Sequence, residues 1–446
     1  MKRLINPMVS PIDAQPPGTP RAVGFLLQLA VFDSVVSINP AAAEDSSLSR
    51  QLLWGALGLA AIIYLVVVRL SQSDRNFSFG GWPLAMLLLY VFASTAWSVT
   101  PLATIKRDIL LAFLVAVCSV SVGSSNADWR KDVFSTLLAT PMAWLVGLAM
   151  VVTLVAPGRA FTELGWRGLA SQKNLAGQMM ALTLLLLFYG VCHDKLRKWT
   201  RIFIILFATT LLLLSKSTTA LLGLAFCVSA TELLTLRTTI RHLATWKLAL
   251  VGVFLVGSAL LYFAFILQVL PGAGELYSKG LGILGKSETF TGRTAIWNLV
   301  LGESRFHNTW LGGGYGGFWV GRNSISGYVI VGNDLYPGQA HNGYIDIYND
   351  LGILGIFVLA VVLVASLYQA QRVLALRVAE GKIHLAIPLI CLFLNLGEST
   401  FFRSTNFMNI IFLASFIRAA SILRQARASH LVLGPVATVT CSVNNI

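Results

Sequence analysis

Long apolar segments alternate with short polar ones along most of the chain. Twelve of these segments have roughly the 17–25 residues that an α-helix needs to cross a bilayer. They cover residues 22–38, 51–69, 82–98, 105–123, 133–156, 174–193, 200–215, 217–236, 247–270, 343–368, 384–398 and 404–423. The pattern predicts an all-α, polytopic integral membrane protein with about twelve transmembrane helices.

The polar stretches between these segments divide the chain into five regions. We expect an N-terminal tail over 1–21, nine spans over 22–270, a large loop over 271–342, three spans over 343–423 and a C-terminal tail over 424–446. A loop as long as 271–342 is usually functional in a compact protein. We therefore expect the chemistry on the side of the membrane where this loop lies.

The first apolar segment has an alternative interpretation. Ala41-Ala42-Ala43 follows it and resembles a signal-peptidase site. The sequence before that site is long and rich in proline, however, and Asp33 interrupts the apolar run. These features favour a retained span and leave cleavage as the alternative.

The composition supports a membrane protein and limits its partners. Hydrophobic residues make up 56% of the chain and charged residues 12%, where soluble domains average about 25% charged. This balance excludes a disordered tail, a secreted disulfide scaffold and a soluble multidomain enzyme. The net charge of +14 is explained by anchoring of the spans on the cytoplasmic side, without nucleic acid. If the basic cluster at 195–201 is cytoplasmic, both termini and Arg418 are cytoplasmic too.

By the positive-inside rule, lysine and arginine gather in cytoplasmic loops. Some basic residues of this chain fall on the outer side of the membrane instead. Those in short loops or at span ends are Lys106, Arg107, Lys173, Lys216 and Arg403. A single residue of this kind can extend its charged group to the lipid headgroups. Several on one face indicate an anionic ligand, for which a diphosphate is the obvious candidate.

Histidine and cysteine positions narrow the possible chemistry further. His193, His242, His384 and His430 fall on the inner side, where we expect them to be solvated, while His307 and His341 fall outside. The cysteines in or beside spans are expected to be small core residues without disulfides. No zinc-type spacing occurs, so neither a metal nor another cofactor is expected.

The large loop combines glycines with aromatic residues. Five of its glycines lie within 312–317, and the neighbouring rings are Trp310, Tyr315, Phe318, Trp319 and Tyr328. This composition suits carbohydrate, because sugar faces stack on aromatic rings and glycine permits close approach. The segment is not a phosphate-binding P-loop, since the GK[ST] element is missing.

The same loop contains a short amphipathic pattern that begins at Thr291 and runs to Glu303. It predicts a helix with an apolar face formed by Ile296, Trp297, Val300 and Leu301. The simplest interpretation is a helix that lies on the membrane surface. Arg293 falls outside the apolar face.

The span after the loop begins with polar residues. His341 and Asn342 are followed by Asp346 and Asp350. Carboxylates so close to a span are costly unless they are paired or face a wet cavity, so this end should line a polar cleft. Glu398 lies at the outer end of another predicted span. It could pair with His341 or an outer arginine, or simply with the neighbouring Arg403.

Five segments between about 170 and 400 share their order and spacing with a known family. They are 340–344 (AHNGY), 349–355 (NDLGILG), 171–177 (SQKNLAG), 214–220 (LSKSTTA), and 291–297 (TGRTAIW) with 312–319. The first two resemble the signature of the O-antigen ligase/polymerase superfamily. The others are similar to its exopolysaccharide polymerases of the succinoglycan type. The first 100 residues match only as generic spans.

The resemblance implies a metal-independent glycosyltransferase of the bacterial inner membrane, with its active face in the periplasm. Such an enzyme transfers glycan from undecaprenyl diphosphate to a sugar hydroxyl of a repeat-unit acceptor, in exopolysaccharide or O-antigen biosynthesis. The expected partners are this lipid-linked donor, the glycan acceptor, membrane lipids and other polysaccharide-assembly proteins.

The resemblance also suggests roles for individual residues. His341 matches the family's essential histidine at the end of the loop, and Arg293 matches the basic residue of the loop helix. Lys173 and Lys216 fall where the family places basic residues facing the diphosphate, although some relatives have arginine there, which binds phosphate bidentately. We expect His341 to accept the acceptor's proton. Further substrate-binding residues are expected to be Asn174, Ser217, Asn342, Glu398 and Arg403.

Four alternatives to a polymerase remain, and one of them is a protein-glycosylating relative within the same enzyme class. An O-antigen ligase would transfer the polymer to lipid A core instead of a growing chain. A transporter of polysaccharide or lipid-linked oligosaccharide would also have about twelve spans and basic residues, but no internal repeat is visible. A structural partner in an envelope complex would not need histidine, arginine and lysine gathered on one face.

Overall fold

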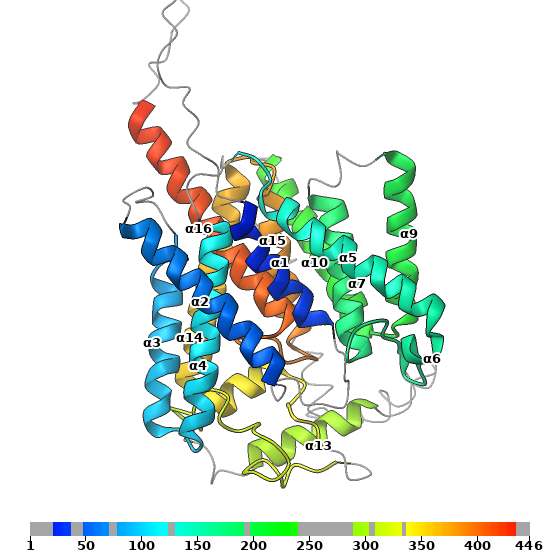
Figure 1. Ribbon diagram of the computed structural model, residues 1–446, viewed down its shortest axis with the longest axis vertical. Coiled ribbons are helices and arrows are strands. Elements are labelled where there is room, and N and C mark those ends of the chain that lie inside the picture. The colour runs from blue at the N-terminus through cyan, green and yellow to red at the C-terminus, as the bar shows by residue number, and fades with distance from the viewer. Residues whose placement is uncertain are drawn as a thin grey trace, which may run out of the picture.

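A bundle of long helices forms most of the structure (Figure 1). The computed structural model describes residues 21–36, 48–70, 78–123, 130–190, 197–239, 289–302, 308–331 and 336–433. The longer helices are α1 (Arg21–Val35), α2 (Leu48–Leu70), α3 (Trp82–Ser94), α4 (Pro101–Val122), α5 (Phe134–Val155), α7 (Lys173–Tyr189), α9 (Lys198–Leu214), α10 (Thr218–Thr239), α13 (Thr289–Gly302), α14 (Gly343–Ala375), α15 (Gly381–Leu394) and α16 (Phe407–Leu433). The short elements are η1 (Thr95–Trp97), α6 (Pro157–Ala160) and the antiparallel strands β1 (Phe161–Thr162) and β2 (Gly165–Trp166).

The helices confirm most of the apolar pattern. Eleven of the twelve predicted spans overlap these helices, and the range 247–270 lies outside the described residues. Within the described residues, α2, α5, α10, α14 and α16 are long and apolar enough to cross a membrane. The chain is therefore a mostly helical membrane protein. The total of twelve spans and the five-region division remain predictions.

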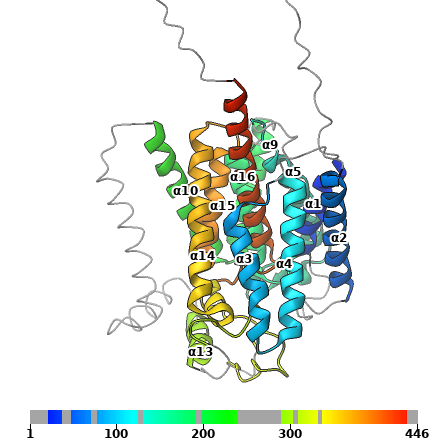
Figure 2. The ribbon, with the colours of Figure 1, turned by 90° about the vertical axis from the view of Figure 1, so that its left-hand side faces the viewer.

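One end of the bundle carries α13 and the segments 308–331 and 336–342, and we call it the loop end (Figures 1 and 2). The helices differ in how far the bundle covers them. In an apolar stretch of 18 residues in α16, 83% is buried inside the protein, against 22% in the corresponding stretch of α2. α16 is therefore central, whereas α2 exposes Leu52, Leu59 and Ile63 on a surface suited to lipid.

Asp33 inside α1 has partners that explain its tolerance in an apolar helix. Its Oδ2 atom accepts hydrogen bonds from Arg50 Nε at 3.1 Å and Trp54 Nε1 at 3.0 Å. Both partners belong to α2. The carboxylate that interrupts the first apolar run thus connects two helices. Charged residues within membrane spans are usually paired in this way.

A buried ion cluster lies at the opposite end of the bundle, where the prediction of solvated side chains is wrong. Glu380 Oε2 accepts from Arg418 Nε and from His384 Nε2, both at 2.9 Å. The side chains of Arg418 and His384 are 0% exposed. Burial by itself raises the pKa of Glu380, but the His384 hydrogen bond and the Arg418 charge lower it to about 2. Three helices converge here, which removes the cluster from solvent.

α14 is broken near the loop end. Gly352 has φ 65° and ψ −162°, outside the helical region. The carbonyls of Asn349 and Asp350 consequently lose their helical partners. They accept instead from the backbone N–H groups of Gly313 and Gly314, at 3.0 and 2.9 Å.

The same loop also provides hydrogen-bond partners for the backbone on the C-terminal side of the break. The N–H groups of Ile353 and Leu354 donate to the carbonyls of Thr309 and Trp310, at 2.9 and 3.2 Å. A Cβ atom on Gly352 would lie 2.4 Å from the Trp310 carbonyl carbon. Irregular backbone at membrane depth is tolerated only where protein satisfies its polar groups, and this loop does so.

The loop packs on a small core of its own. Ile296, Trp297 and Val300 of α13 are buried against Phe318 and Trp319. The amphipathic helix is confirmed, but it covers this core, and Leu301 on its expected apolar face is 43% exposed.

Packing inside the protein reduces the number of aromatic rings in the loop that could stack on a sugar. Tyr315, Phe318 and Trp319 are buried, whereas Trp310 is 61% exposed. A Cβ atom on Gly314 would lie 2.4 Å from Ser98 Oγ, so this glycine is closely packed against protein. The buried rings support the loop, and Trp310 remains the exposed ring among those four.

Candidate functional site

Glu398 joins three separate segments at the loop end. It lies four residues after Leu394, the last residue of α15, so this helix ends before the predicted span does. Its Oε1 atom accepts hydrogen bonds from Arg293 Nη2 of α13, at 3.0 Å, and from the Asn174 side-chain amide of α7. Its Oε2 atom lies 3.6 Å from His341 Nδ1. The structure therefore brings together four of the residues predicted for the site.

The surroundings keep Glu398 ionised. Its side chain is only 7% exposed, and burial by itself raises the pKa of a carboxyl group. Hydrogen bonding and charge from His341, followed by the charge of Arg293 and the Asn174 hydrogen bond, outweigh burial and lower the pKa of Glu398. A buried carboxylate then holds both a guanidinium and an imidazole.

His341 lies in an unusual backbone conformation just before α14. Its φ of 50° is uncommon for a residue with a side chain, so the flanking segments must hold it. Its Nδ1 atom also lies 3.1 Å from Gln339 Nε2. The side chain is 21% exposed, so the ring remains within reach of a ligand.

Asn342 has a structural role that the prediction of a substrate-binding residue did not include. Its Oδ1 atom caps α14 by accepting from the N–H groups of Tyr344 and Ile345, at 3.1 and 3.3 Å. Its own N–H donates to Ser399 Oγ at 3.1 Å. The residue is 1% exposed. Asn342 thus fixes where the helix after His341 begins.

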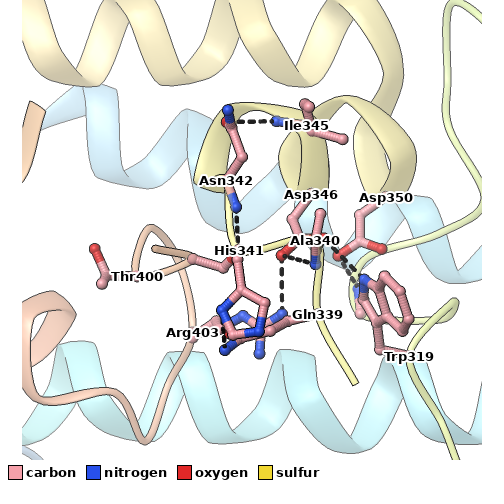
Figure 3. Close-up of polar contacts among 12 residues, drawn as sticks. Trp319, Gln339, Ala340, His341, Asn342, Ile345, Asp346, Asp350, Thr400 and Arg403 are labelled. Carbon is pink, nitrogen blue, oxygen red and sulfur yellow. Dashed lines mark hydrogen bonds and ion pairs between the residues drawn. The ribbon is translucent and has the colours of Figure 1, made fainter. Parts of the chain in front are cut away.

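Arg403 is held by a carboxylate that the sequence analysis did not assign to the site. Arg403 Nη2 donates to Asp346 Oδ2 at 3.0 Å, and Figure 3 shows this contact beside His341. The two alternatives for Glu398 are thereby decided, because Glu398 pairs with Arg293 and His341 while Arg403 pairs with Asp346. The signal that could have identified Asp346 is a carboxylate placed five residues after His341 at the start of a span.

The remaining predicted residues lie in other surroundings. Lys173 Nζ donates to the Leu164 carbonyl at 3.1 Å. Lys216 is exposed in the turn between α9 and α10, with φ 51°. Ser217 is buried, and a Cβ atom on Gly177 would lie 2.7 Å from its Cβ. These contacts are structural for Lys173 and Ser217, and they leave Lys216 at the surface.

The start of α10 also borders Arg293. A Cβ atom on Gly397 would lie 2.6 Å from Thr219 Cγ2 and 3.1 Å from Arg293 Nη1. A larger residue at this position would press on the Thr219 side chain and on the end of the Arg293 side chain. The residue before Glu398 therefore lets Arg293 reach its carboxylate.

The side chains gathered here are of types that can bind an anion and transfer a proton. Within the described residues, no group of three or more His, Cys, Asp or Glu side chains could hold a metal ion. Two arginines, two carboxylates and one histidine gather beside the start of a helix. Guanidinium groups bind phosphate oxygens, and histidine transfers protons near neutral pH.

Comparison with known proteins gives one family. Residues 202–360 match the family model described as O-antigen ligase. The matched region contains Arg293, His341 and Asp346, whereas Glu398 and Arg403 lie beyond it. No curated protein matches the chain. The match supports the O-antigen ligase/polymerase superfamily, whose members are membrane glycosyltransferase-like enzymes.

Proposed function

We propose that the protein is a polysaccharide polymerase of the bacterial inner membrane. It transfers glycan from undecaprenyl diphosphate to a sugar hydroxyl of a repeat-unit acceptor at the periplasmic face. The observation that carries this proposal is the contact of His341 and Arg293 with the same buried carboxylate of Glu398. A proton acceptor and an anion-binding group are thereby placed side by side at the end of a membrane bundle.

The transfer forms one bond and breaks another at the anomeric carbon of the donor sugar. The acceptor hydroxyl attacks this carbon, and the bond to the diphosphate oxygen breaks, so negative charge develops on the leaving lipid diphosphate. Preorganised cationic groups stabilise such charge. Arg293 and Arg403 are the groups that the protein holds in place for this purpose.

The charge balance of the site assigns a further role to lysine. Arg293 is paired with Glu398, and Arg403 with Asp346, so the two pairs together carry no net charge. A diphosphate therefore needs additional cations to balance it. Lys173, which directly precedes Asn174, and Lys216, in the turn before α10, are the lysines that we expect to supply this charge.

His341 accepts the proton of the attacking hydroxyl. Which ring nitrogen can do so depends on the hydrogen bond made by the other one. Nδ1 faces Glu398 and Gln339. The Gln339 amide nitrogen can only donate to Nδ1, so the amide must turn its oxygen toward the ring before Nδ1 can carry the proton. In that tautomer Nε2 is the acceptor. Glu398 also stabilises the imidazolium that forms.

An O-antigen ligase is the second candidate function. The description of the matched family favours it, and the chemistry at the anomeric carbon is the same. The resemblance of 214–220 and 312–319 to exopolysaccharide polymerases favours polymerisation. The two functions differ in the acceptor, which is a growing chain for a polymerase and lipid A core for a ligase.

Complementation of a deletion strain tests the proposal. The strain would carry wild type, His341→Ala, Arg293→Ala or the control Lys382→Ala, whose side chain pairs with Glu232 away from the site. We expect both site variants to lose long exopolysaccharide and leave single repeat units on the lipid carrier, with unchanged lipopolysaccharide. Polymer on the carrier with bare lipid A core would establish a ligase instead.

A third outcome would refute both enzymatic functions. If His341→Ala and Arg293→Ala gave the same glycans as wild type at equal protein levels, the loop end would not be catalytic. Accumulation of lipid-linked oligosaccharide on the cytoplasmic side of the deletion strain that carries no copy of the gene would then favour a transporter.

A further inference from the structure

Asp346 connects three segments of the loop end through one buried carboxylate. Its Oδ1 atom accepts from Trp319 Nε1 at 2.8 Å and from the backbone N–H of Ala340 at 3.1 Å. Its Oδ2 atom accepts from Arg403 Nη2 at 3.0 Å (Figure 3). The side chain of Asp346 is 7% exposed. The Ala340 N–H also lies 3.4 Å from Oδ2, so the contacts that distinguish the two oxygens are those of Trp319 with Oδ1 and Arg403 with Oδ2.

The Oδ2 contact orients a cation that faces the site. Arg403 keeps 33% of its side chain exposed while one guanidinium nitrogen is bound to Asp346. A long side chain held at one point loses much of its rotational freedom before a ligand arrives. Preorganisation of this kind lowers the entropic cost of binding an anion.

The Oδ1 contacts fix the backbone that leads into His341. Ala340 directly precedes His341, whose φ of 50° requires support from its neighbours. Trp319 Nε1 binds the same oxygen and links this backbone to the core of the loop. Asp346 therefore acts on the position of the imidazole without contacting it.

We propose that Asp346 is a positioning residue that orients Arg403 toward the lipid diphosphate and holds the backbone of His341. The inference rests on the proposed function for the identity of the ligand. Asp346 and Glu398 are then equivalent devices. Each uses a buried carboxylate to hold one arginine, and each also restrains His341, through Ala340 or through the ring.

The two oxygens can be separated by mutation. In Asp346→Asn the Oδ1 acceptor for Trp319 and Ala340 can remain, while an amide that donates hydrogen bonds replaces the atom facing Arg403. Trp319→Phe has the reverse effect, because it removes a donor from Oδ1 and leaves the ion pair. A merely structural carboxylate would make both variants fail in the same way.

The experiment measures binding of undecaprenyl diphosphate to purified protein in nanodiscs, together with transfer kinetics. The variants are Asp346→Asn, Arg403→Gln, their double mutant and Trp319→Phe, with Lys382→Gln as control. We expect Asp346→Asn to weaken binding and raise the donor KM about tenfold, the size of a lost charged hydrogen bond. In the Arg403→Gln background the same change should add less than about twofold.

Trp319→Phe should show the opposite division. We expect its binding to stay within about twofold of wild type, since the Arg403 pair is retained, while kcat falls. Additive effects of Asp346→Asn and Arg403→Gln would overturn the inference. So would equal losses of binding in Asp346→Asn and Trp319→Phe, or a loss of folded protein in all variants.

The outcome also separates this inference from the proposed function. If wild type binds no undecaprenyl diphosphate and transfers no glycan, the proposed function fails and the inference fails with it. If wild type binds and transfers but the double mutant is additive, the positioning role alone is wrong.

Discussion

The break in α14 provides the sharpest test of how the loop end is held together. Replacing Gly352 by alanine places a methyl group at φ 65°, ψ −162°, a region that residues with side chains rarely adopt. The new Cβ would lie 2.4 Å from the carbonyl carbon and oxygen of Trp310. These atoms are backbone, so no flexible side chain can move aside, and the loop itself must shift.

The expected cost follows from these contacts. Holding alanine in this backbone region costs about 1–3 kcal/mol. Displacing the loop also breaks the hydrogen bonds from Ile353 and Leu354 to Thr309 and Trp310, at about 1 kcal/mol each. Gly352→Ala should therefore lower the free energy of unfolding by about 3–5 kcal/mol.

The assay is equilibrium unfolding of purified protein in mixed micelles with increasing SDS fraction. Gly147→Ala is the matched control, because Gly147 lies in helical α5 and a Cβ atom added there would have nothing within 4 Å. We expect that control to differ from wild type by less than about 1 kcal/mol. If Gly352→Ala unfolded within about 1 kcal/mol of the control, the loop would not be supporting the break.

Three further predictions concern the buried carboxylates. Glu380→Gln leaves Arg418 without its charged partner and should cost about 3–5 kcal/mol, measured by the same unfolding assay. Because the pKa of Glu380 is lowered from 4.5 to about 2, its stabilisation is complete above pH 4.5 and is lost as the pH falls toward 2. Wild-type stability should decline in that window more steeply than that of Glu380→Gln. Glu398→Gln should reduce glycan transfer at least about tenfold, since Arg293 and His341 lose a charge-assisted partner. An unchanged transfer rate in folded protein would contradict this role.

Local sequence pattern was sufficient for the helices. In a bilayer each segment must satisfy its own backbone hydrogen bonds, so an apolar run of sufficient length becomes a helix whatever it packs against. The amphipathic pattern after Thr291 predicted α13 for a similar reason. Motif resemblance identified Arg293 and His341, and the charge rule singled out Arg403 as a basic residue on the outer side.

Which charged side chains pair with one another could be learned only from the tertiary structure. Glu398 and Arg293 are 105 residues apart, and their contact depends on how α13 and the segment after α15 are arranged. Asp346 was visible as a costly carboxylate near a span, but its binding of Arg403 depends on the same packing. No local pattern specifies which of several charges will meet.

Burial at the opposite end was likewise decided by packing. His384 and Arg418 have the sequence surroundings of solvated inner residues, yet both are fully buried around Glu380. Four glycines of the loop show the same dependence, because their close neighbours are other parts of the chain, and they are Gly312, Gly314, Gly316 and Gly317. Local patterns in the sequence were enough to predict which segments are helical and which residue types reach the loop end. Tertiary structure decided which charges pair and which are removed from water, because both depend on distances between segments far apart in the chain.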